Sequence, residues 1–63
     1  MDEADRNRLS RGIRVVLRRA RQPLSLEEIA HVVKAPTADV YEAISIDLHG
    51  FYEMKGAKFR WLR

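Results

Sequence analysis

The sequence predicts a small α+β domain, mainly α-helical, in which three helices precede a two-stranded β-hairpin. As far as His49, apolar residues recur at the spacing of three to four that is typical of amphipathic helices. After Gly50 the spacing shortens to two, as in a half-buried strand. A chain of 63 residues suffices for one domain, so we expect residues 1–63 to form a single unit.

The first helix is expected over residues 5–21. Its apolar residues fall on one stripe, which comprises Leu9, Ile13, Val16, Leu17 and Ala20. Pro23 disfavours helical geometry in the residue before it and therefore ends this helix. Gly12 is unfavourable inside a helix, and we interpret it as a point where a neighbouring element comes close to the backbone.

The second helix, expected over residues 26–34, has the clearest local signal in the sequence. Ser25 and Glu28 have the spacing of a capping box, in which each side chain accepts a hydrogen bond from the other residue's backbone amide. Leu24 and Ile29 occupy the two positions of a hydrophobic staple around that cap. The helix is therefore predicted to begin directly after the serine.

The third helix is expected over residues 38–49, after a break at Ala35-Pro36. Thr37 is suited to cap its N-terminus, and Gly50 is suited to the left-handed conformation just past its end. Helical spacing places four apolar residues on one face, namely Val40, Tyr41, Ile44 and Leu48. We expect this face to pack on the other two helices.

Residues 51–62 predict two strands around a turn at Gly56-Ala57. Glycine fits the first central position of a type II′ turn, the tight turn that joins antiparallel strands. This turn pairs Met54 with Phe59, Tyr52 with Trp61, and Glu53 with Arg60. A turn at Lys55-Gly56 would shift the pairing by two and would leave every side chain on the same face.

One face of the hairpin carries most of the aromatic side chains, namely Tyr52, Phe59 and Trp61, together with Met54. Exposed aromatic rings can form a platform on which nucleic-acid bases stack. Three short helices need an apolar cover, however, so we predict that this face closes the core. The residues predicted to be buried are Ile13, Leu17, Ile29, Val33, Val40, Ile44, Leu48, Phe59 and Trp61.

Two segments carry a resemblance to a known family. Residues 23–30, Pro-Leu-Ser-Leu-Glu-Glu-Ile-Ala, are similar to the entry into the second helix of winged helix-turn-helix domains, and residues 51–61 are similar to a minimal wing. The pattern most resembles the HARE-type helix-turn-helix group and the beta subunit of general transcription factor E. This resemblance implies a three-helix winged helix-turn-helix fold, with the C-terminal hairpin as its wing, and a role in transcription or chromatin machinery.

The net charge of +3 is unevenly distributed along the chain. Residues 1–21 hold seven arginines against three acidic residues, and residues 51–63 hold four basic residues against one acidic residue. Residues 35–50 hold three acidic residues and no lysine or arginine. The two ends are therefore basic and the middle is acidic.

The basic ends predict weak, sequence-independent binding to double-stranded DNA through its phosphates. Arginine makes bidentate, permanently charged contacts with phosphate oxygens. An arginine-rich helix face can also be a merely solvated surface, and exposed lysines also protect sheet edges from aggregation. The candidate nucleic-acid-binding residues are Arg8, Arg11, Arg14, Arg18, Arg19, Lys55, Lys58 and Arg60.

The third helix, which reads the major groove in a typical winged helix, lacks the side chains for that task. Its outward positions hold no Arg, Lys, Asn or Gln, the residues that supply most base-edge contacts. This face is either a solvated acidic surface or a docking site for a protein partner, built around a large apolar side chain. The candidate partner-binding residues are Glu42, Ser45, Ile46 and His49.

Several function classes are not expected from this composition. Cysteine is absent, and His31 and His49 lie on different expected helices, so we expect no metal site. No catalytic-triad order, paired-carboxylate cleft or glycine-rich phosphate loop stands out, so we expect no enzyme, cofactor or small-molecule substrate. The apolar runs are short and the N-terminus is acidic, which predicts neither a membrane segment nor a signal peptide. We therefore expect an intracellular protein of the cytoplasm or nucleus.

Overall fold

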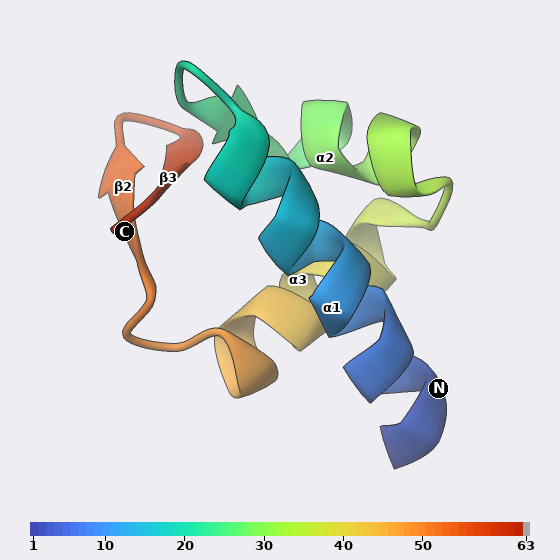
Figure 1. Ribbon diagram of the computed structural model, residues 1–63. Coiled ribbons are helices and arrows are strands. Elements are labelled where there is room, and N and C mark those ends of the chain that lie inside the picture. The colour runs from blue at the N-terminus through green and yellow to red at the C-terminus, as the bar shows by residue number, and fades with distance from the viewer. Residues whose placement is uncertain (63) are drawn as a thin grey trace.

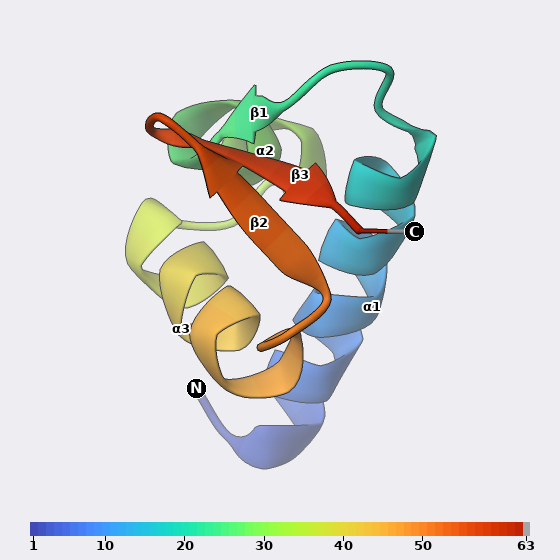
Figure 2. The same cartoon turned by 90° about the vertical axis from the view of Figure 1, so that its left-hand side faces the viewer.

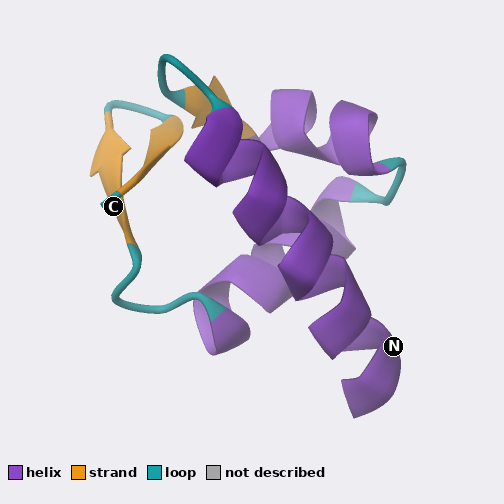
Figure 3. Cartoon of the chain, in the orientation of Figure 1, coloured by secondary structure: helices purple, strands orange, loops and turns teal. Residues whose placement is uncertain are grey.

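The computed structural model describes residues 1–62, which form three helices and a three-stranded antiparallel sheet (Figure 1). In chain order the elements are α1 (Glu3–Arg19), β1 (Leu24–Ser25), α2 (Leu26–Val33), α3 (Thr37–Asp47), β2 (Tyr52–Lys55) and β3 (Lys58–Trp61). Helices predominate, and the sheet lies to one side of them (Figure 3). None of the helices within residues 1–62 has the length and apolar character needed to cross a bilayer.

The first helix begins and ends two residues earlier than predicted. Asp2 caps it, because its carboxylate accepts a hydrogen bond of 2.8 Å from the amide of Asp5. After Arg19 the backbone of Ala20 is extended, so the helix ends before Pro23 can act on it. The early end leaves a short connection that leads the chain back to the sheet.

The second helix begins as the sequence predicts. The amide of Glu28 donates to Ser25 Oγ at 3.1 Å, and the amide of Ser25 donates to Glu28 Oε1 at 2.7 Å, so both halves of the capping box are present. The helix ends at Val33, and Lys34 follows with a left-handed backbone (φ 59°). The amide of Ala35 then donates to the carbonyl of Ala30 at 3.1 Å and closes the end of the helix.

The third helix differs from the prediction at both ends. Thr37, the predicted cap, is instead the first helical residue, and Pro36 holds the cap position without a side-chain hydrogen bond. The helix ends at Asp47 rather than at residue 49. Gly50 has a positive φ of 91°, which glycine adopts readily, and the chain turns there toward the sheet.

The sheet contains one strand that the sequence did not predict. β2 and β3 pair in the predicted register, with Tyr52 opposite Trp61 and Met54 opposite Phe59. The additional strand β1 pairs with the other edge of β3, with Leu24 opposite Phe59, so that β3 is the central strand. In Figure 2 the end of β3 runs toward α1, and the hairpin turn lies at the far end of the strand.

Seven of the nine residues predicted to be buried are buried. The core comprises Ile13, Leu17, Ile29, Ala30, Val40, Ala43, Ile44, Leu48 and Phe59. The prediction is wrong for Val33 and Trp61, which pack against this core from its rim and stay partly exposed. Met54, on the predicted core face of the hairpin, is 50% exposed, because it lies near the turn and beyond the helices. Tyr41 is 59% exposed and does not share the core face of α3.

Gly12 does not mark a close backbone approach. A Cβ atom added to Gly12 would lie 3.9 Å from Val33 Cγ1, which is an ordinary van der Waals contact. The packing of α1 on α2 therefore leaves room for a larger residue at this position.

Candidate nucleic-acid interface

Three exposed arginines form a row along α1. Arg11, Arg14 and Arg18 follow one another at spacings of three and four, which places them on one face of the helix. Within residues 1–62 the ion pairs involve other arginines, so these three guanidinium groups have no carboxylate partner. Like charges at this spacing cost a few tenths of a kcal/mol per pair, and the row therefore has a small cost to stability.

Trp61, at the end of β3, lies beside this row. The guanidinium carbon Cζ of Arg14 is 5.8 Å from the centre of the Trp61 ring, within the range of a cation–π interaction. α1 and β3 pack together at this point, and Figure 2 shows the end of the strand next to the helix. The tryptophan thus marks the place where the arginine row meets the sheet.

Two grooves meet at this tryptophan. One is lined by Arg14, Arg18, Gly50, Phe51, Trp61 and Leu62. The other is lined by Leu17, Arg18, Ala20, Arg21, Gln22, Phe59, Arg60 and Trp61. No acidic side chain lines either groove. The two grooves together, with their four arginines, are called the Trp61 surface below.

Phe51 gives the first groove an aromatic wall. Its ring stacks on Trp61, with the two ring centres 5.7 Å apart and the planes only 9° from parallel. Phe51 is nevertheless 54% exposed. Phe51 precedes β2 and follows Gly50, whose φ is positive, so strand alternation does not determine where its ring lies.

The other predicted arginines occupy different surroundings. Arg8 donates to Asp5 Oδ1 at 2.9 Å and lines a separate groove, so its charge is partly neutralised. Arg19 lines a shallow surface with Val15 and Arg18. Arg60 does reach the Trp61 surface, although its guanidinium also pairs with Glu53 at 2.7 Å. Of the candidate arginines, Arg14, Arg18 and Arg60 line the Trp61 surface, whereas Arg8, Arg11 and Arg19 do not.

The hairpin lysines do not join this group. Lys55 and Lys58 face each other across the two-residue turn, and both are exposed. Lys58 and Trp61 are three positions apart on β3, a distance of about 10 Å in extended chain. The pKa of Glu28 is lowered mainly by the hydrogen bond that its carboxylate accepts from the Ser25 amide. The positive charge of Lys58 lowers it further. The turn is thus a second, smaller basic surface.

Sequence reasoning missed a polar cluster between α1 and α3. Ser10 is buried, and its hydroxyl donates to Asp47 Oδ2 at 2.6 Å. Arg6 Nε lies 3.2 Å from both oxygens of the same carboxylate. A signal was present, because Ser10 stands three and seven residues before Ile13 and Leu17 and hence on the apolar stripe of the helix. The cluster fixes one arginine as a structural residue.

The predicted partner-binding residues lie on the outer side of α3 and just past its end. Glu42, Ile46 and His49 are exposed, whereas Ser45 is half-buried. Ile46 is 55% exposed, and Tyr41 on the same helix is exposed to a similar extent. Two large apolar side chains therefore reach solvent from a helix whose surface otherwise carries acidic groups.

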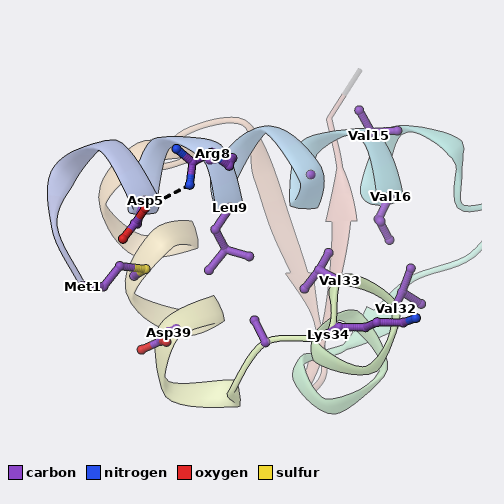
Figure 4. A pocket seen from close by; sticks show the side chains of 12 residues that line it. Met1, Asp5, Arg8, Leu9, Val15, Val16, Val32, Val33, Lys34 and Asp39 are labelled. Carbon is purple, nitrogen blue, oxygen red and sulfur yellow. Dashed lines mark hydrogen bonds and ion pairs between the residues drawn. The ribbon is translucent and has the colours of Figure 1, made fainter.

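A further groove runs between α1, the end of α2 and the start of α3 (Figure 4). Its walls are mainly apolar, and Val15 and Val32 contribute exposed side chains to them. Asp5 and Arg8 form an ion pair at its rim, which Figure 4 shows as a dashed line. This groove has no cluster of unpaired charge comparable to that around Trp61.

Comparisons of the chain with protein families, with curated proteins and with solved structures found no match. Within residues 1–62, no group of three histidine or acidic side chains gathers as a metal site would require.

Proposed function

We propose that the protein is a nucleic-acid-binding module that holds phosphates on the Trp61 surface. The observation that supports this most strongly is the convergence of Arg14, Arg18, Arg21 and Arg60 on Trp61 without an acidic lining residue. These arginines come from α1, from the connection after it and from β3, so separate parts of the chain contribute to one basic surface. Guanidinium groups suit such a surface because they form paired hydrogen bonds with phosphate oxygens.

The proposed binding has low sequence specificity. Contacts to phosphates fix a protein on nucleic acid but carry no sequence information directly. The exposed side chains of α3 include the Glu42 carboxylate rather than the basic and amide groups that read base edges. A surface built from arginines on α1 and β3 is therefore expected to bind duplexes of different sequence alike.

The element order and the antiparallel sheet are compatible with a winged helix, in which β2 and β3 would be the wing. The resemblance of residues 23–30 and 51–61 to winged helix-turn-helix domains supports the same assignment. We extend the proposal on that resemblance to an intracellular role in transcription or chromatin machinery, with double-stranded DNA as the ligand. Lys55 and Lys58 at the hairpin turn would supply secondary phosphate contacts.

A salt titration tests this proposal. If about four phosphates are neutralised, the logarithm of the binding constant should fall with the logarithm of salt concentration at a slope near −3.6. Affinities for random duplexes at physiological salt should lie at roughly 10⁻⁴–10⁻⁶ M, measured by fluorescence anisotropy of a labelled duplex. Absence of binding even at low salt, or binding that salt does not weaken, would contradict the proposal.

Protein docking through α3 is a second candidate, favoured by the exposure of Tyr41 and Ile46. A second copy of the chain is the simplest partner to test. Sedimentation should then show a mass that rises with concentration, and Ile46→Ser should abolish that rise. A monomer at all concentrations would contradict self-association through α3.

A further inference from the structure

We propose that the groove lined by Arg14, Arg18, Gly50, Phe51, Trp61 and Leu62 holds an unpaired nucleobase. The protein would then prefer nucleic acid that carries a single-stranded segment over a blunt duplex. This inference rests on the proposed function and assigns a ligand to one part of the Trp61 surface.

The stacked pair of Phe51 and Trp61 is an incomplete stack. The two rings are nearly parallel, yet Phe51 remains 54% exposed. An exposed phenyl ring held against a second ring offers a flat apolar surface to the solvent. A nucleobase is flat and has two π faces, so it can extend such a stack whatever its identity.

The backbone holds Phe51 in place before any ligand arrives. Its amide donates to the carbonyl of Leu48 at 3.0 Å, and its carbonyl accepts from the amide of Leu62 at 3.0 Å. The positive φ of Gly50 directs the chain into this position. Because the ring is already ordered, a ligand that stacks on it pays less of the entropy that binding otherwise costs.

The charges beside the rings suit a nucleotide better than an apolar ligand. Arg14 and Arg18 line the same groove, and neither takes part in the ion pairs found within residues 1–62. Acidic side chains are absent from the lining. A base stacked on Phe51 would therefore have cationic groups available for its adjoining phosphates.

The same geometry disfavours paired bases. In a duplex both faces of an internal base are covered by its neighbours, and exposing one requires unstacking at a cost of a few kcal/mol. An unpaired nucleotide in an overhang or a single strand has already lost that cover. The groove should therefore discriminate by base pairing rather than by sequence, and DNA and RNA strands share the required chemistry.

Labelled oligonucleotides of similar length test the inference at low salt. The probes are a blunt DNA duplex, the same duplex with a short thymidine overhang, oligothymidine and oligouridine. We expect the overhang to bind about tenfold more tightly than the blunt duplex, as one added base stack would give. Trp61 is the only tryptophan in the chain and stacks on Phe51, so a change in its fluorescence with the unpaired probes alone should report a ligand in this groove. Comparison of oligothymidine with oligouridine shows whether the groove binds unpaired bases of DNA or of RNA more tightly.

Substitutions at Phe51 distinguish an effect of its aromatic ring from an effect on the fold. Phe51→Leu keeps an apolar side chain and both backbone hydrogen bonds, and it should reduce the ratio of overhang to blunt affinity to about one. Phe51→Tyr keeps an aromatic ring, so it should keep the ratio of overhang to blunt affinity found in the unmodified protein. Tyr41→Leu removes a similarly exposed ring on α3 and should leave the ratio as it is in the unmodified protein.

Three results would overturn the inference. If blunt and overhang duplexes bind equally and with the expected salt dependence, the unpaired-base site is wrong while the phosphate-binding function stands. If Phe51→Leu keeps the preference, the stack does not hold the base. If no probe binds at low salt, both the proposed function and this inference fail.

Discussion

The hydroxyl of Ser10 on α1 donates a hydrogen bond of 2.6 Å to the carboxylate of Asp47 at the end of α3. Arg6 approaches the same carboxylate, so its charge and its lone pairs are both satisfied. Within residues 1–62, Ser10 is the buried polar side chain of a core that is otherwise apolar. The contact joins the middle of α1 to the end of α3.

This contact predicts a loss of stability in acid. The hydrogen bond from Ser10 and, after it, Arg6 lower the pKa of Asp47. A carboxyl group whose pKa is lower in the folded chain stabilises the fold above its unfolded pKa, and this stabilisation is lost as the pH falls through the folded pKa. We expect the thermal midpoint of unfolding to decrease as the pH falls below about 5, where an unfolded aspartate begins to bind protons.

Asp47→Asn supplies the control for that prediction. The variant should melt at a lower temperature than the unmodified protein at neutral pH, and the difference between the two should narrow in acid. Glu28, whose pKa is also lowered, titrates in both proteins, so it does not affect the difference. Parallel pH profiles for the two proteins would show that Asp47 contributes no pH-dependent stability.

The core should depend more on Phe59 than on Trp61. Phe59 is buried at the centre of the sheet, whereas Trp61 packs at the rim. Phe59→Ala should cost about 3–5 kcal/mol, which is enough to unfold so small a domain. Trp61→Ala should remain folded with a lower midpoint. Circular dichroism melts of both variants test the order, and a less stable Trp61→Ala would reverse it.

Gly12 offers a stabilising substitution. Glycine inside a helix costs about 1 kcal/mol relative to alanine, and an added Cβ would meet only Val33 at an ordinary distance. Gly12→Ala should therefore raise the thermal midpoint by roughly 4–8 °C. A lowered midpoint would mean that the contact between α1 and α2 is tighter than the 3.9 Å separation indicates.

Features with a local cause could be predicted from the sequence. The capping box depends on two residues three positions apart, and the register of β2 and β3 depends on a turn between neighbouring strands. The pairing of Leu24 with Phe59 and the contact of Ser10 with Asp47 join residues more than thirty positions apart. Such contacts depend on the path of the whole chain, which helix and strand periodicity do not describe.

The candidate site shows the same division. Helical spacing alone placed Arg11, Arg14 and Arg18 on one face of the first helix. The position of Trp61 beside them could not be predicted, because strand alternation assigned the whole ring to the core. The position of Phe51 beside Trp61 was not predicted either, since alternation within a strand does not describe the turn at Gly50 that precedes it.

The last prediction decides which basic surface holds the phosphates. Arg14→Gln with Arg18→Gln should weaken binding to all duplexes alike and should flatten the salt slope by about 2 units, since two phosphate contacts are lost. Lys55→Gln with Lys58→Gln removes the same charge from the hairpin turn and should change the slope less. Because the two variants lose equal charge, a general effect of net charge would flatten both slopes equally. If only the lysine variant flattened the slope, the turn would be the contact surface and the assignment to Trp61 would be wrong.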